Sequence, residues 1–404
     1  MRTVIYKSQA KGNVCAPTSK SMAHRLLIAA SLAEGESKIS GITPCDDVLA
    51  TIDCLSALGV RCSLAGDTVT VQGFDLRKSS PNLPLNARES GSTLRFMIPL
   101  ALLSGRETVF RGAQRLLERP MEIYEELCES RRFRYARVGD TITVEGKLTG
   151  GEYSLPGNIS SQFITGLLFA LSATGEESRI KITTEIESRS YIELTRAAMA
   201  KFGVEAIWEN ESTLCIKGGQ RYTAKDVSVE GDFSGSAFLE AFNLFGGEVN
   251  VDGLSERSLQ GDRIYRELYP LLKSDAPVIN IEDCPDLGPI LFAVSAGLFG
   301  AEFVGTKRLK IKESDRAAAM AEELRKFGCD ITVFDNSVVI RKSDIHAPKE
   351  ILSGHNDHRI VMSLAVLSSV YGGEINGSEA VKKSYPDFFR DIERLGIKFI
   401  HKDN

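Results

Sequence analysis

Hydroxyl, amide and basic side chains recur in short clusters that open apolar segments, and such clusters could bind phosphate or carboxylate groups. Residues 18–25 read TSKSMAHR, in which Ser21 and Arg25 share a helical face. Helix N-termini attract anions because their unpaired N–H groups and the helix dipole both favour negative charge. A cap with solvated basic residues is the alternative. The apolar segment LLIAASLA that follows predicts a buried helix. This favours anion binding, because the start of such a helix is expected to face a cleft rather than open water.

Six further clusters have the same character, although each alone has an ordinary structural explanation. Arg119 could lie on the surface, Asp286 could be a helix N-cap, and His358 could be structural. A charged start such as KESDR is also typical of a helix with local ion pairs. Their recurrence at equivalent points of one repeat favours a shared site. These clusters are ESGSTLR at 89–95, LLERP at 116–120, SSQ at 160–162, PDLGP at 285–289, KESDR at 312–316 and NDHR at 356–359.

The elements that position the clusters are helices that end at regularly spaced glycines. A polar start and a glycine stop are typical of a helix. The spacing therefore predicts six copies of one unit, each with a buried helix. The glycines are Gly35, Gly105, Gly175, Gly246, Gly300 and Gly372, which are 70, 70, 71, 54 and 72 residues apart.

A second, amphipathic helix is predicted in each copy, together with alternating strands. GDTVTVQG at 66–73 and GDTITVEG at 139–146 alternate with period two, which predicts half-buried strands. The predicted unit is strand, buried helix, strand, amphipathic helix, strand, strand. Three units form a lobe of about 200 residues, so the sequence predicts an α/β protein of two lobes. The second helices are expected at 46–58, 118–130, 190–202, 262–272, 314–327 and 386–395.

The composition disfavours several classes of partner. The chain has 404 residues, 43% of them hydrophobic and 25% charged, and its formal net charge of −5 argues against nucleic acid or an anionic membrane. The longest apolar stretches are too short to span a bilayer, and the first residues alternate like a strand rather than a leader peptide. The eight cysteines form no CxxC motif, and no Cys/His cluster suggests a metal. We therefore expect reduced thiols, a cytoplasmic protein and no metal.

Seven motifs, in order along nearly the whole chain, resemble those of the 5-enolpyruvylshikimate-3-phosphate synthase family. The resemblance implies two lobes, each an inside-out α/β barrel of three repeats. Residues 1–18 and 231–404 would form the C-terminal lobe, and residues 19–230 the N-terminal lobe. It also implies a monomer that transfers the enolpyruvyl group of phosphoenolpyruvate to the 5-hydroxyl of shikimate 3-phosphate, releasing phosphate without a metal or organic cofactor. The motifs are SKSMAHR, ESGSTLRF, LLERP, SSQF, KESDR, NDHR and KKSYPDFF.

The resemblance also implies a role for each matching residue. Asp286, Glu313 and Lys20 would be catalytic, and the two carboxylates would transfer protons, since paired carboxylates suit an addition that needs one acid and one base. The residues implied for shikimate 3-phosphate are Lys20, Ser21, Arg25, Ser160, Ser161, Gln162, Ser188, Tyr191, Asp286 and Lys312. Those implied for phosphoenolpyruvate are Lys20, Gly91, Arg119, Gln162, Arg316, Arg359 and Lys383.

Three alternative functions stay open on the sequence. The sister enolpyruvyl transferase that acts on UDP-N-acetylglucosamine usually carries a reactive cysteine on a loop and an asparagine shortly after its first lysine. Here Ser21 follows Lys20, and residues 80–127 contain no cysteine. A non-catalytic anion-binding protein of the same fold is disfavoured by the intact set of charged residues. A nucleic-acid end-processing enzyme built on the same kind of repeat is disfavoured by the acidic balance.

Overall fold

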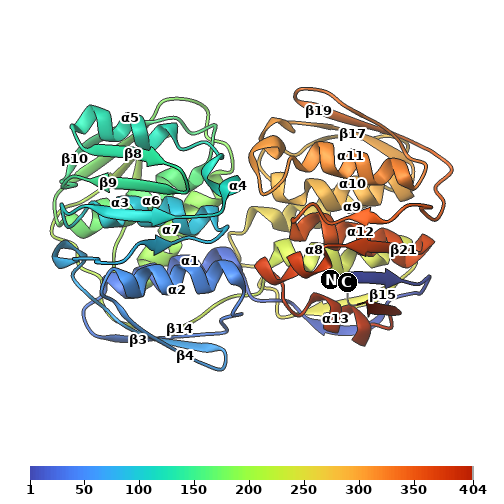
Figure 1. Cartoon of the computed structure of the whole chain (residues 1–404), viewed down its shortest axis with the longest axis horizontal. Helices are drawn as coiled ribbons and strands as arrows, with labels where there is room; N and C mark the ends of the chain where they lie inside the picture. Colours follow the sequence, from blue (N-terminus) through green and yellow to red (C-terminus); the bar gives the residue numbers. More distant parts are fainter. Residues whose placement is uncertain (403–404) are drawn as a thin grey trace. The chain divides into compact units, whose positions relative to one another are not determined.

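The computed structural model describes residues 1–402 (Figure 1). The chain divides into two compact units: residues 20–230 form one, and residues 1–19 with the residues from 231 onward form the other. Each unit has its own hydrophobic core. All eight cysteines are free thiols and six of them are buried. Among the described helices, none combines the length and the apolar character that crossing a membrane requires.

The unit formed by residues 20–230 contains three four-stranded sheets of one pattern. Their strand orders are β14-β3-β5-β4, β6-β7-β9-β8 and β10-β11-β13-β12, and in each the first pair is parallel and the next two pairs are antiparallel. In Figure 1 the helices α1, α3 and α6 fill the middle of this unit, with strands such as β3, β4, β8 and β10 around them. The strands are β3 (Glu36–Ser40), β4 (Arg61–Ala65), β5 (Thr68–Gln72), β6 (Leu85–Asn86), β7 (Thr108–Arg111), β8 (Arg134–Val138), β9 (Thr141–Glu145), β10 (Gly151–Leu155), β11 (Ser178–Ile182), β12 (Ala206–Asn210), β13 (Thr213–Ile216) and β14 (Val227–Ser228).

The helices of this unit follow the predicted alternation of buried and amphipathic segments. Nearly every residue of α1, α3 and α6 is buried, whereas α2, α5 and α7 keep exposed faces. Serine hydroxyls cap two of the buried helices. The hydroxyl of Ser90 accepts a hydrogen bond from a backbone N–H in the first turn of α3, and that of Ser160 accepts one from the first turn of α6. The helices are α1 (Lys20–Leu32), α2 (Asp46–Ala57), α3 (Gly91–Ala101), α4 (Gln114–Leu117), α5 (Glu122–Arg131), α6 (Ser161–Thr174) and α7 (Arg189–Lys201).

The other unit repeats the same sheet order twice and completes it with the N-terminus of the chain. Its sheets are β16-β17-β19-β18, β20-β21-β1-β22 and the pair β15-β2. Strand β1 (Arg2–Ile5) lies antiparallel between β21 (Gly373–Asn376) and β22 (Phe399–Lys402). Its remaining strands are β2 (Lys11–Cys15), β15 (Glu248–Asp252), β16 (Val278–Asn280), β17 (Gly300–Val304), β18 (Asp330–Val333), β19 (Ser337–Arg341) and β20 (Leu352–Ser353). Its helices are α8 (Phe233–Glu240), α9 (Tyr265–Leu271), α10 (Gly288–Gly297), α11 (Arg316–Lys326), α12 (His358–Tyr371) and α13 (Phe388–Arg394).

The fourth copy departs from the predicted unit. After α9 the next strand is β16, which pairs in parallel with β17 and so belongs to the fifth copy. The two strands predicted after the amphipathic helix are therefore missing from this copy within residues 1–402, which accounts for the short spacing of 54 residues between Gly246 and Gly300. Its helix predicted at 262–272 is also divided, into a 3-10 turn at Gly261–Ile264 and α9.

The six glycines do not all end helices directly. Gly175, Gly246 and Gly372 occupy C-cap positions, whereas Gly35, Gly105 and Gly300 lie beyond the helix end, in a turn or at the start of the next strand. All six have positive φ, between 76° and 107°. The repeated glycines therefore share a left-handed backbone conformation, both where they end a helix and where they precede or begin the next strand.

Candidate active site

The first candidate residues open helix α1 in the unit formed by residues 20–230. Lys20 is the first residue of the helix, and its Nζ lies 2.7 Å from Oδ2 of Asp47 in the first turn of α2. Both side chains are mostly buried, so the carboxylate holds the ammonium group in place. Asp47 could not be identified from the sequence, because an aspartate in the first turn of a helix already has an ordinary explanation in the helix dipole.

Arg25 lies one turn further along α1 and is almost completely buried. Its guanidinium donates to Oγ1 of Thr195 at 2.9 Å, to the carbonyl of Tyr191 at 3.1 Å and to the carbonyl of Ser21 at 2.7 Å. Burial lowers the pKa of Arg25 to about 10, so it is still a cation at neutral pH. Ser188 precedes α7 in a left-handed conformation, with φ of 55°, and its carbonyl accepts the N–H of Tyr191. Helices α1 and α7 therefore bring Ser21, Arg25, Ser188 and Tyr191 together.

Gly91 is the first residue of α3 and lies directly against the guanidinium of Arg119. A Cβ atom on residue 91 would lie 2.8 Å from Nη1 and 3.0 Å from Cζ of Arg119. Arg119 is buried and lies in the turn between α4 and α5. The absence of a side chain at Gly91 thus leaves room for a cation beside a helix N-terminus.

Gln162, in the first turn of α6, is held at both ends of its amide. Its Nε2 donates to Oγ of Ser92 at 2.9 Å, and its Oε1 accepts from Nη1 of Arg95 at 2.7 Å. Arg95 also donates to the carbonyl of Pro120 at 3.0 Å, next to Arg119. Arg95 therefore links the starts of α3 and α6 to the turn that carries Arg119, a role that the sequence analysis did not assign to it.

Ser160 and Ser161 complete the start of α6. The hydroxyl of Ser160 accepts the N–H of Gln162 at 3.3 Å, and Ser161 is buried. All ten candidate residues of this unit lie at or beside the N-termini of α1, α3, α6 and α7. They are Lys20, Ser21, Arg25, Gly91, Arg119, Ser160, Ser161, Gln162, Ser188 and Tyr191.

In the other unit the candidate residues surround Asp286. Its Oδ1 lies 3.1 Å from Nζ of Lys312 and 2.8 Å from Nη1 of Arg316, and its Oδ2 lies 3.2 Å from Nη2 of Arg359. Burial by itself would raise the pKa of Asp286, but the charges of Arg359, Lys312 and Arg316 hold it well below its ordinary range. The carboxylate is therefore ionised at neutral pH and contacts three cations. Burial also lowers the pKa of Lys312, to about 8.

Arg316, the first residue of α11, connects Asp286 to two further carboxylates. Its Nε donates to Oδ2 of Asp357 at 2.8 Å, and its Nη2 donates to Oε2 of Glu313 at 2.6 Å. Asp357 is fully buried and caps α12 by accepting the backbone N–H of Arg359 at 2.9 Å. Burial opposes the charge of Arg316, yet the three carboxylates raise its pKa overall. The role of Asp357 could not be predicted from the sequence, because an N-cap aspartate needs no second partner to be explained.

Lys383 completes this group from the 3-10 turn Ser378–Lys383 (η6). It is 7% exposed, and its Nζ lies 2.5 Å from the backbone carbonyl oxygen of Asn356. Asn356 immediately precedes Asp357, so this lysine is attached to the same loop that begins α12. The six candidate residues of this unit are thus connected through the starts of α11 and α12. They are Asp286, Lys312, Glu313, Arg316, Arg359 and Lys383.

Of the structural interpretations of these motifs, one is wrong and one is confirmed. Asp286 does not cap a helix: it lies within the 3-10 turn Pro285–Leu287, whose N-cap position is Cys284, and its carboxylate contacts cations. KESDR does open α11 with a local ion pair, between Glu313 and Arg316, and the cap of this helix is Asp315, which accepts the N–H of Ala318 at 3.1 Å.

Nearly the whole chain is similar to proteins of one known family. The family model described as EPSP synthase (3-phosphoshikimate 1-carboxyvinyltransferase) matches residues 5–392. The chain belongs to this family. A protein named 3-phosphoshikimate 1-carboxyvinyltransferase from Clostridium perfringens is 38% identical to this chain, over 98% of both chains. A protein of the same name from Clostridium kluyveri is also 38% identical, over 97% of this chain and 96% of the relative. One from Clostridioides difficile is 37% identical over 97% of both chains.

Solved structures support the fold. EPSP synthase from Acinetobacter baumannii superimposes with a TM-score of 0.78, covering 99% of this chain and 100% of that one, at 22% sequence identity. The fold class predicted from the repeat and the motifs, two lobes that are each an inside-out α/β barrel of repeated units, is confirmed.

Proposed function

We propose that this chain transfers the enolpyruvyl group of phosphoenolpyruvate to the 5-hydroxyl of shikimate 3-phosphate and releases phosphate. The observation that carries the proposal is the grouping of Asp286 and Glu313 with Lys312, Arg316 and Arg359 in one unit. Three cations suit two anionic substrates, and two carboxylates suit a reaction in which protons are both delivered and removed. The names of the relatives support the proposal.

The charges of the substrates explain why so many cations are needed. Two phosphates carry about −1.5 to −2 each at neutral pH, and each substrate adds a carboxylate. When these groups bind Lys312, Arg316 and Arg359, the cations contact Asp286 less closely, so its pKa rises towards the ordinary range. Substrate binding would thereby convert Asp286 from a partner in ion pairs into a base.

The proposed reaction is an addition followed by an elimination. Glu313 delivers a proton to the methylene carbon of phosphoenolpyruvate, which leaves C2 electrophilic. The 5-hydroxyl oxygen then attacks C2 while its proton passes to Asp286, and the ammonium of Lys20 binds negative charge on the substrates. Glu313 finally takes a proton back from the methyl group, and phosphate leaves with the electron pair of its bond to C2. Holding both substrates in line for attack contributes as much as the proton transfer.

The binding roles proposed for the remaining residues follow their chemistry. We propose that the two compact units are the two lobes of the enzyme. Shikimate 3-phosphate is assigned to Lys20, Ser21, Arg25, Ser160, Ser161, Gln162, Ser188, Tyr191, Asp286 and Lys312. Phosphoenolpyruvate is assigned to Lys20, Gly91, Arg119, Gln162, Arg316, Arg359 and Lys383.

We further propose that the chain acts as a cytoplasmic monomer, with neither nucleic acid nor a membrane as partner. The formal net charge of −5 supports the absence of a polyanionic partner. Size-exclusion chromatography with light scattering tests the monomer, and a dimer under assay conditions would contradict it.

A phosphate-release assay tests the proposed reaction. Phosphate should appear only when shikimate 3-phosphate and phosphoenolpyruvate are both present, and EDTA should leave the rate unchanged. Glu313→Gln, purified in the same way, controls for contaminating phosphatases. Release with UDP-N-acetylglucosamine in place of shikimate 3-phosphate would overturn the proposal, as would release from either substrate alone.

A further inference from the structure

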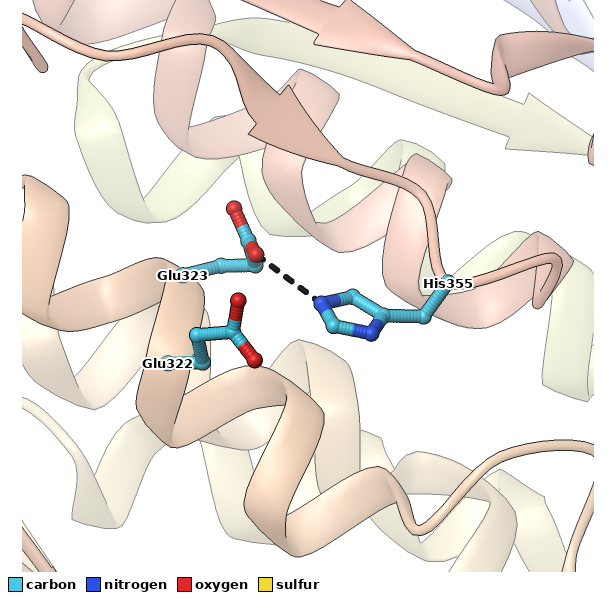
Figure 2. A group of neighbouring side chains, drawn as sticks. All are labelled: Glu322, Glu323 and His355. Atoms are coloured by element: carbon cyan, nitrogen blue, oxygen red, sulfur yellow. Dashed lines mark hydrogen bonds and ion pairs between the residues drawn. The ribbon is translucent and has the colours of Figure 1, made fainter.

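A charged cluster outside the candidate active site joins α11 to the loop before α12. Figure 2 shows Glu322, Glu323 and His355, with Nε2 of His355 2.9 Å from Oε1 of Glu323. Glu323 is completely buried, and its Oε2 accepts the backbone N–H of Ser353 at 2.9 Å. Nζ of Lys326 lies 3.0 Å from one oxygen of Glu323 and 2.9 Å from the other. A buried carboxylate thus contacts the ammonium of Lys326, the imidazole of His355 and one backbone amide.

The cluster is an internal ion-pair network rather than a metal site. Glu322, Glu323 and His355 have the ligand chemistry of a divalent cation, and their ligand atoms lie within 4.8 Å of one another. However, the ammonium of Lys326 already donates to both oxygens of Glu323, and its positive charge would repel a divalent cation bound to that carboxylate. The function of the cluster must therefore be sought in the loop that it holds.

That loop has an unusual backbone. His355 and Asn356 both have positive φ, 46° and 50°, a conformation that residues other than glycine rarely adopt. Such a turn persists only where surrounding contacts hold it. The imidazole of His355 provides one such contact through Glu323, and the carbonyl of Asn356 provides another by accepting from Lys383.

The loop is attached to one face of α11 at two points. Arg316 and Glu323 are seven residues apart on this helix, about two turns, so their side chains leave it on the same side. Arg316 binds Asp357, and Glu323 binds His355, two residues earlier in the loop. The carbonyl that orients Lys383 belongs to Asn356, which lies between these two attachments.

We propose that Glu323 and His355 are positioning residues for the phosphoenolpyruvate-binding groups Lys383 and Arg359. Their contact fixes the left-handed turn, and with it the direction of the Asn356 carbonyl and the position of the cap from which Arg359 projects. The inference rests on the proposed function, because the roles of Lys383 and Arg359 in binding belong to that function.

The pH dependence of this contact offers a specific readout. The hydrogen bond to Glu323 raises the pKa of His355 above 6.5 against the effect of burial; Glu322 adds to the rise and Lys326 opposes it. The imidazolium pairs with the carboxylate below this pKa, and the contact weakens as pH increases through it. KM for phosphoenolpyruvate should therefore rise with pH in the wild-type protein relative to His355→Gln, in which this dependence is absent.

Steady-state kinetics test the proposal with four variants. His355→Gln and Glu323→Gln should each raise KM for phosphoenolpyruvate about 2- to 30-fold, the range for residues that act through others. KM for shikimate 3-phosphate and kcat should change less than about twofold. The double variant should be no worse than the poorer single one, because both changes break one contact. His346→Gln, at an exposed histidine whose Nδ1 lies 2.9 Å from the carbonyl oxygen of Ala347, should behave like the wild type. Unchanged KM in both single variants, or additive losses in the double one, would overturn the proposal.

Hydrogen exchange and NMR separate failure of this inference from failure of the proposed function. By NMR, the pKa of His355 should lie above 6.5 in the wild type and return towards 6.5 in Glu323→Gln. By hydrogen exchange, the backbone amides of residues 355–357 should exchange faster in both single variants than in the wild type. These results can be obtained even if the wild type releases no phosphate, an outcome that would reject the function alone. If these amides exchange at the wild-type rate in both single variants, the positioning role is overturned. It is also overturned if Zn²⁺ raises the melting temperature of the wild type and His355→Gln abolishes that rise.

Discussion

Replacing Gly91 with alanine should weaken phosphoenolpyruvate binding without weakening the fold. The new Cβ atom would lie 2.8 Å from Nη1 of Arg119, whereas ordinary contact begins at 3.4 Å, so the guanidinium must retreat by about 0.6 Å. A charge-assisted hydrogen bond contributes about 1.5–3 kcal/mol. If the displacement removes about half of it, KM for phosphoenolpyruvate should rise about 4- to 13-fold.

The fold should tolerate this change. Gly91 does not have positive φ, and the colliding group is the end of a flexible side chain rather than backbone. A glycine-to-alanine change at a compatible position typically stabilises a protein by about 0.4–1 kcal/mol. The melting temperature of Gly91→Ala should therefore equal or exceed that of the wild type.

Phosphate release at varied phosphoenolpyruvate, with shikimate 3-phosphate saturating, gives KM, and a thermal melt gives stability. The decisive comparison repeats the change in an Arg119→Ala background, where the collision partner is absent and Gly91→Ala should add nothing. The reasoning is refuted if KM for phosphoenolpyruvate is unchanged, or if Gly91→Ala has the same effect with and without Arg119.

Three further predictions concern single charged groups. Glu313→Gln should lower kcat by at least about 10²-fold, with both KM values nearly unchanged. Exchange of solvent deuterium into the methylene group of phosphoenolpyruvate should fall in parallel. A variant that keeps more than about a tenth of wild-type turnover would contradict the proton-transfer role of Glu313. KM for shikimate 3-phosphate should rise as pH increases through about 8, because Lys312, whose pKa burial lowers to that value, loses its charge. Lys312→Arg should remove this pH dependence, since arginine stays protonated, and its persistence in the variant would reject the explanation. Arg25→Ala should raise KM for shikimate 3-phosphate about 10- to 150-fold while leaving phosphoenolpyruvate nearly unaffected; equal losses for both substrates would argue against separate subsites.

The repeat could be predicted from sequence because its signals are local. Strands β5 and β9 show the alternating burial that GDTVTVQG and GDTITVEG predict. The fourth copy could not be predicted correctly, since its strand β15 pairs with β2 from the N-terminus of the chain. Pairing between segments so far apart in sequence leaves no pattern within either of them.

Residue types identified the candidate site, but not the contacts within it. A helix cap was the structural alternative for Asp286, whose carboxylate instead contacts three cations. Asp47 and Asp357 were not identified at all, because an aspartate at a helix start looks the same in sequence whether or not it also binds a lysine or an arginine. The partner of such a group is set by tertiary packing, which composition and spacing do not specify.

The pairing of β1 with β21 and β22 has a consequence for how the protein is made. Arg2 pairs with Asn376 on one side and with Lys402 on the other, so β1 cannot complete its sheet until β22 has been synthesised. Residues 20–230 contain all the strands of their own three sheets and can fold while synthesis continues. This unit should therefore fold first, and β1 needs protection from wrong partners until β21 and β22 have left the ribosome.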